Sequence, residues 1–196
     1  MLNKPRASLI DHSKAVKDLL KAGVDCWMSS GTAKALGVEY HHRTHTAASY
    51  MFGVEGRKIF PFPLEHDAAE PIGFFIEDIH GDKCLFIPDT AFIKNRFLGV
   101  NILCVECNFV PDILSRNIAA GLPQIVGSRI RRNHMSLDTV IAMIQANDLS
   151  RCREIWLLHL SDGNSDENEM RSRVQEATGI PTFVAQADSH HNNKED

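Results

Sequence analysis

Residues 64–90 read LEHDAAEPIGFFIEDIHGDKCLFIPDT and carry the strongest structural signal in the chain. The apolar runs FFI and CLFI are bounded by turn residues, with Gly81 and Asp82 between them, and this pattern predicts a β-hairpin. His66 precedes the first strand and Asp89 follows the second. Because both positions fall at the same end of the hairpin, we expect the two side chains to converge. Imidazole and carboxylate are ligands of zinc and manganese, so the pair indicates a metal site; an incidental loop histidine and turn aspartate is the alternative.

Composition limits the function classes that remain. The 196 residues are 43% hydrophobic and 23% charged, as is usual for a globular domain. A net charge of −4 argues against a broadly basic nucleic-acid surface. No apolar run approaches the roughly 20 residues that span a bilayer, and the start of the chain lacks the apolar region of a signal peptide. Five cysteines without a secretory context indicate a reducing cytosol. We therefore expect one cytoplasmic α/β domain over residues 1–186, followed by a polar tail at residues 187–196.

Other polar residues stand at the ends of predicted elements. Asp11 and His12 open a helical pattern, either as an N-cap and its neighbour or as two ligands at a loop-to-helix junction. His159 closes the apolar strand pattern CREIWLLH, where a lone histidine is more often a satisfied core residue than a ligand. The segment around residues 98–109 predicts a buried strand that ends near Glu106, to which we assign no chemical role. Residues 41–50 have the composition of an exposed loop.

Three arginines precede a histidine in the segment SRIRRNHMSL. Arg129, Arg131 and Arg132 lead to His134, and Ser136 is a candidate N-cap for the helix that follows. Guanidinium groups and free backbone N–H groups at a helix entrance are suited to bind a phosphate. A solvated basic loop is the simpler interpretation when the segment is considered alone.

The order of these pieces along the chain resembles the metallo-β-lactamase superfamily. The resemblance covers residues 11–186 and is carried by Asp11-His12, HDAAEPIGF (66–74), IPDT (87–90), NHMSL (133–137) and HLSDGN (159–164). It is strongest to compact bacterial and phage hydrolases, including the phage phosphodiesterases that degrade cyclic nucleotide signals (anti-Pycsar proteins), and extends more distantly to tRNase Z. The resemblance implies an αββα sandwich: two mixed sheets lie face to face, helices lie outside them, and a metal site lies at one edge.

The resemblance also implies residue roles. The implied metal ligands are Asp11, His12, His66, Asp89 and His159, with Asp89 bridging two ions. Asp11 and His134 are the implied catalytic residues, and His134 would donate a hydrogen bond or proton near the scissile phosphate. Arg129, Arg131 and Arg132 are weaker candidates for binding substrate. The implied activity is hydrolysis of phosphodiester bonds, in nucleotides or cyclic nucleotides, by a metal-bound hydroxide on one or two Zn²⁺ or Mn²⁺ ions.

The chain departs from the superfamily at its start. The motif's two leading histidines should fall at positions 7 and 9, which are Ala7 and Leu9. We therefore expect a domain that lacks its first strands, with one complete metal site and a second that keeps only His66 and Asp89. A truncated, inactive relative that only binds a metal or a partner is the alternative function. The uncovered sheet edge favours pairing with a second chain, so we expect a homodimer, with no membrane partner, in the cytoplasm (the host's, if phage-encoded).

Overall fold

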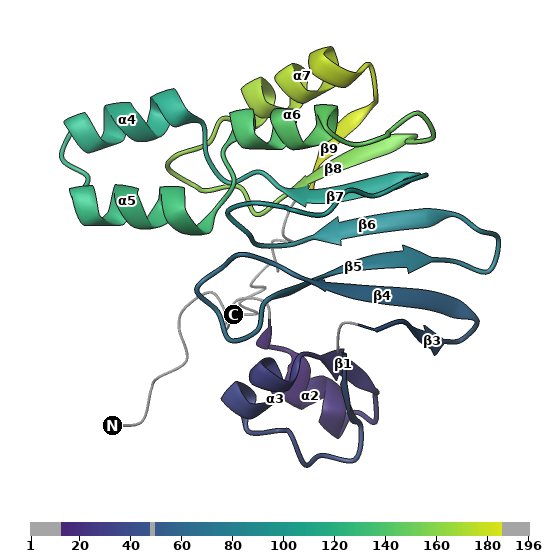
Figure 1. Cartoon of the computed structure of the whole chain (residues 1–196). Helices are drawn as coiled ribbons and strands as arrows, with labels where there is room; N and C mark the ends of the chain where they lie inside the picture. Colours follow the sequence, from purple (N-terminus) through teal and green to yellow (C-terminus); the bar gives the residue numbers. More distant parts are fainter. Residues whose placement is uncertain (1–12, 48–49, 186–196) are drawn as a thin grey trace, which may run out of the picture.

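A seven-stranded mixed sheet forms the centre of the molecule (Figure 1). A computed structural model describes residues 13–47 and 50–185. The strands are β1 (Cys26–Met28), β2 (Thr44–Thr46), β3 (Phe52–Val54), β4 (Arg57–Pro63), β5 (Ile72–Glu77), β6 (Lys83–Ile87), β7 (Ile102–Glu106), β8 (Glu154–Leu158) and β9 (Thr182–Val184). The helices are α2 (Val16–Lys21), α3 (Ser30–Leu36), α4 (Pro111–Ala119), α5 (Gln124–Asn133), α6 (Leu137–Gln145) and α7 (Glu167–Thr178). The large sheet runs in sequence order from β3 to β9, and β1 and β2 form a separate parallel pair.

The hairpin predicted from residues 64–90 is confirmed. Strands β5 and β6 pair antiparallel, with Phe74 opposite Phe86. The turn between them includes Gly81 at a φ of 85°, a left-handed conformation that glycine adopts without a steric cost. His66 lies before β5 and Asp89 after β6, so both lie at the same end of the hairpin.

From β6 onward the sheet is parallel, and this arrangement sets the position of the site. Strands β6, β7, β8 and β9 are parallel neighbours, and helices α4–α7 lie to one side of the sheet (Figure 1). The cross-strand row of Leu85, Leu103 and Ile155 has at most 1% exposure and belongs to the main core. Parallel strands carry their carboxyl ends to one edge, where open α/β sheets place ligands. Residues that follow β6, β7 and β8 therefore meet there.

Two local predictions are wrong. Arg129, Arg131 and Arg132 do not form a loop at a helix entrance, because they lie within α5, and His134 is that helix's C-cap. Helix α5 is stabilised by packing that periodicity does not reveal: a Cβ added to Gly127 would clash with the Ile118 side chain of α4. The expected loop at residues 41–50 contains β2, which pairs with β1.

Some predictions fall outside the described residues. Asp11, His12 and the tail at residues 187–196 belong to these segments. The expected pair of facing mixed sheets corresponds, within the described residues, to one seven-stranded mixed sheet and one two-stranded parallel sheet. In the same part of the chain, no helix has the length and apolar character needed to span a membrane.

Candidate metal centre

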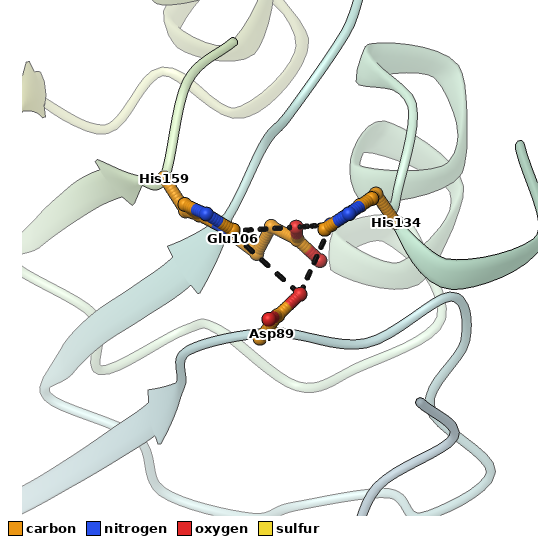
Figure 2. Close-up of side chains that lie close together, drawn as sticks. All are labelled: Asp89, Glu106, His134 and His159. Carbon is orange, nitrogen blue, oxygen red and sulfur yellow. Dashed lines mark hydrogen bonds and ion pairs between the residues drawn. The ribbon is translucent and has the colours of Figure 1, made fainter. Parts of the chain in front are cut away.

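Two carboxylates and two imidazoles meet at the carboxyl edge of the parallel strands (Figure 2). Asp89 follows β6, Glu106 is the last residue of β7, His159 follows β8 directly, and His134 caps α5. One possible ligand atom from each of these four residues lies within 4.8 Å of the others. Four segments that are far apart in sequence thus build one compact cluster.

Glu106 is at the centre of this cluster. Its side chain is fully buried, at 0% exposure. Oε2 accepts hydrogen bonds from the backbone N–H groups of Thr90, at 2.8 Å, and Met135, at 3.4 Å. Oε1 is 2.6 Å from His134 Nδ1 and 3.2 Å from His159 Nδ1. The backbone therefore fixes one carboxylate oxygen, and the other orients both histidines.

Asp89 approaches the same two imidazoles from the neighbouring turn. Its Oδ1 is 3.0 Å from His134 Nδ1 and 3.7 Å from His159 Nδ1. His159 has a φ of 55°, a left-handed conformation that is uncommon for residues other than glycine and is found at functional sites. Asn108 Nδ2 donates a 2.8 Å hydrogen bond to the His159 carbonyl and so supports this conformation.

The pKa values follow from these contacts. Burial alone would raise the pKa of Asp89, but hydrogen bonds from His134 and His159 outweigh it and hold that pKa well below its usual range. Hydrogen bonds to Asp89 and Glu106 raise the pKa of His159 to about 10. Burial disfavours the charged form of His134, yet hydrogen bonds to the same carboxylates raise its pKa to about 9. At neutral pH the protonated imidazoles of His134 and His159 thus balance the two carboxylates. A divalent cation could take over this positive charge, because metal binding releases the imidazole protons.

His66 lies at the margin of this cluster. Its side chain is 2% exposed, and Nε2 lies 3.3 Å from Asp89 Oδ1. Burial lowers the pKa of His66, although the charge of Asp89 opposes this effect. Nδ1 is 3.1 Å from the Ala68 backbone nitrogen and 3.4 Å from Asp67 Oδ1. The Ala68 backbone N–H donates to Nδ1, so Nδ1 is an acceptor and Nε2 of the neutral ring carries the proton that faces Asp89.

The residues of this site match the chemistry of a divalent cation. Imidazole and carboxylate groups together bind zinc, manganese and iron. Within the described residues, His66 Nε2 is buried and makes no hydrogen bond, although it lies close to Asp89. A bound divalent cation would supply the positive charge that the protonated His134 and His159 otherwise give to Asp89 and Glu106. The cluster is therefore a candidate metal centre.

A cleft of about 480 Å³ opens beside the cluster. It is lined by His66, Asn108, Val126, Arg129, Ile130, His134, His159, Leu160, Ser161 and Asp162. Of the three predicted arginines, Arg129 lines this cleft and lies 3.6 Å from Asp67. Arg131 instead donates a 3.2 Å hydrogen bond to Ser115 on α4. The structure thus brings one of the three guanidinium groups to the site.

The structure brings together four of the residues named from sequence and adds another. His66, Asp89, His134 and His159 lie together, whereas Asp11 and His12 lie outside the described residues. Glu106 was missed as a site residue. Its only signal in the sequence is a carboxylate at the end of the strongly apolar run ILCVE, where burial of a charge requires partners.

Comparisons with known proteins identify the fold. No family model matches the chain, and neither does any curated protein. Among solved structures, the metallo-β-lactamase fold protein YhfI from Bacillus subtilis aligns with a TM-score of 0.62 and 14% identity, over 90% of this chain and 70% of that one. A diphosphatase from the PhnP family aligns with a TM-score of 0.56 and 14% identity, over 90% of this chain and 62% of that one. CmlA, a diiron β-hydroxylase from Streptomyces venezuelae, aligns with a TM-score of 0.52 and 10% identity, over 81% of this chain and 36% of that one.

The chain therefore has the metallo-β-lactamase fold, as its sequence motifs predicted. At sequence identities of 10–14%, the similarity defines the fold, whereas the reaction depends on the residues of the site.

Proposed function

We propose that this protein is a metal-dependent hydrolase of phosphodiester bonds, acting on nucleotides or cyclic nucleotides with Zn²⁺ or Mn²⁺. The observation that carries the proposal is the cluster of Asp89, Glu106, His134 and His159 beside a cleft lined by Arg129. The ligand set suits a hard or borderline cation, and a guanidinium suits an anionic substrate. One of the solved structures that share this fold is a diphosphatase, which is compatible with phosphate chemistry.

The residues of the chain have distinct proposed roles. Asp89 and His159 hold the cation, which would lower the pKa of a water molecule and stabilise negative charge on the phosphate. Glu106 binds His134 through Nδ1, so the opposite ring nitrogen is the one that can donate a proton to the leaving oxygen. Arg129 binds the non-bridging oxygens of the phosphate. His66 supplies a further ligand next to Asp89.

Asp11 and His12 are proposed as additional ligands, with Asp11 also catalytic. They directly precede Ser13, which lines a second cavity, of about 280 Å³, together with His66 and Asp89. We also propose that residues 1–186 form one domain, that the protein is a homodimer and that it is located in the cytoplasm. Light scattering on the purified chain tests the homodimer.

Hydrolysis of a chromogenic diester tests the proposed reaction. The purified chain is assayed with bis-p-nitrophenyl phosphate and with cyclic mononucleotides, with and without added Zn²⁺ or Mn²⁺. We expect metal-dependent turnover that Asp89→Asn abolishes and that Arg131→Ala, on the far side of α5, retains. A folded chain that binds the metal but hydrolyses neither substrate would contradict the proposed function and favour the alternative, a module that only binds metal.

A further inference from the structure

We infer that the cleft beside the metal centre is a nucleobase site, built from α5 on one side and the loop after β8 on the other. This inference rests on the proposed function and names the part of the substrate that lies away from the phosphate. A volume of about 480 Å³ falls within the range of roughly 300–1,000 Å³ that small-molecule sites occupy. The cleft thus has room for an organic group beside the reacting phosphate.

Helix α5 supplies an apolar wall that ends in a cation. Val126, Arg129 and Ile130 line the cleft, and Ile125 lies one helical turn before Arg129 on the same side of the helix. Ile125 is 80% exposed and Val126 is 40% exposed. Exposed aliphatic side chains next to a guanidinium match a ligand that is flat and apolar on its faces and anionic at one end.

The loop after β8 supplies the second wall, which carries hydrogen-bond acceptors. Leu160, Ser161 and Asp162 line the cleft. The Ser161 backbone N–H donates a 2.9 Å hydrogen bond to the Asn108 carbonyl, and Ser161 Oγ accepts one of 3.1 Å from Asn164. These bonds fix the loop, and they place a hydroxyl and a carboxylate where the N–H groups at the edge of a base could bind.

Helix α4 connects the two walls. Asn117 Nδ2 donates hydrogen bonds to the Gly163 carbonyl, at 2.7 Å, and to Asn164 Oδ1, at 3.0 Å, within the loop. Through the next residue, α4 also contacts α5, because Ile118 closely approaches Gly127. Because one rigid helix holds both walls, the width of the cleft is set before a ligand arrives. A preformed slot of this kind favours a planar group over a flexible chain.

Paired ligands separate base recognition from phosphate recognition. Calorimetry of the full chain with Zn²⁺ present compares AMP with ribose 5-phosphate, which has the sugar and phosphate but no base. We expect AMP to bind about tenfold or more tightly, because the base would bury apolar surface against the aliphatic side chains of the cleft. Val126→Ser and Asp162→Asn should each remove most of this advantage without changing the affinity for ribose 5-phosphate. Ile79→Ser, at a 66% exposed position in the β5–β6 turn, is the matched control and should retain it.

The outcomes distinguish this inference from the proposed reaction. Equal affinity of the wild type for AMP and ribose 5-phosphate would overturn the nucleobase site, whether or not diesters are hydrolysed. An AMP preference that survives both cleft variants would overturn it as well. Selective AMP binding by a chain that hydrolyses no cyclic nucleotide would support the site and contradict the proposed reaction.

Discussion

Replacing Glu106 with glutamine tests the structural centre of the site. The carboxylate is fully buried, and its Oε1 lies within hydrogen-bond distance of two imidazoles, at 2.6 and 3.2 Å. An amide would keep an acceptor for the backbone N–H groups but would lose the charge that faces His134 and His159. A hydrogen bond to a charged group contributes roughly 1.5–3 kcal/mol, and Asp89 still contacts both histidines. We therefore expect Glu106→Gln to lower the free energy of unfolding of the metal-free protein by about 3 kcal/mol.

The same change should also weaken metal binding. A carboxylate that holds or orients ligands typically changes metal affinity by about 10–100-fold when it is lost. Urea unfolding of the metal-free protein and calorimetric titration with Zn²⁺ measure the two effects. Glu77→Gln is the control, because Glu77 is a strand carboxylate in a surface ion pair with Lys58, and solvent screens such pairs so that they contribute little to stability. Equal unfolding free energies and equal Zn²⁺ affinities for the two variants would refute this account of Glu106.

Three further predictions concern the surroundings of the site. Arg129→Ala should raise KM for a phosphodiester about tenfold, the effect of losing roughly 1.4 kcal/mol of charged contact; an unchanged KM would remove Arg129 from the substrate site. Gly127→Ala should destabilise the wild type by about 1 kcal/mol through overpacking, but should stabilise an Ile118→Ala background by about 1 kcal/mol through helix propensity, as measured by thermal unfolding. The same sign in both backgrounds would argue against the close contact. The Gly31 backbone N–H donates a hydrogen bond to the Glu70 carboxylate, and this bond lowers the pKa of Glu70 below its usual value of 4.5. The bond therefore stabilises the folded protein fully above pH 4.5, and this stabilisation is lost as the pH falls through the lowered pKa of Glu70. An NMR titration of the Gly31 amide should show this step, and Glu70→Gln should lack it.

Strand ends were the most predictable part of the site. His66, Asp89 and His159 were identified because each stands where an apolar run meets a turn, and the structure places all three at one edge of the sheet. Periodicity and turn residues fix such positions locally. The order of motifs then connected these residues into one fold, which the solved structures confirm.

The remaining features depend on contacts between distant segments. Glu106 is buried and charged because Thr90, Met135 and two histidines from other elements surround it, and a strand pattern alone does not reveal those partners. Helix α5 was missed for a similar reason. Its sequence is rich in arginine and has a glycine inside it, and its stability comes from packing against α4.

Anomalous diffraction from zinc-loaded crystals would locate a bound metal directly. We expect a zinc peak bonded to Asp89 and His159, with ligand distances of roughly 2.0–2.2 Å. Glu106 and His134 should lie beside that ion, as their distances here require. Zinc bound only elsewhere on the protein, with the hydrogen bonds between these four side chains left intact, would contradict the assignment of a metal centre.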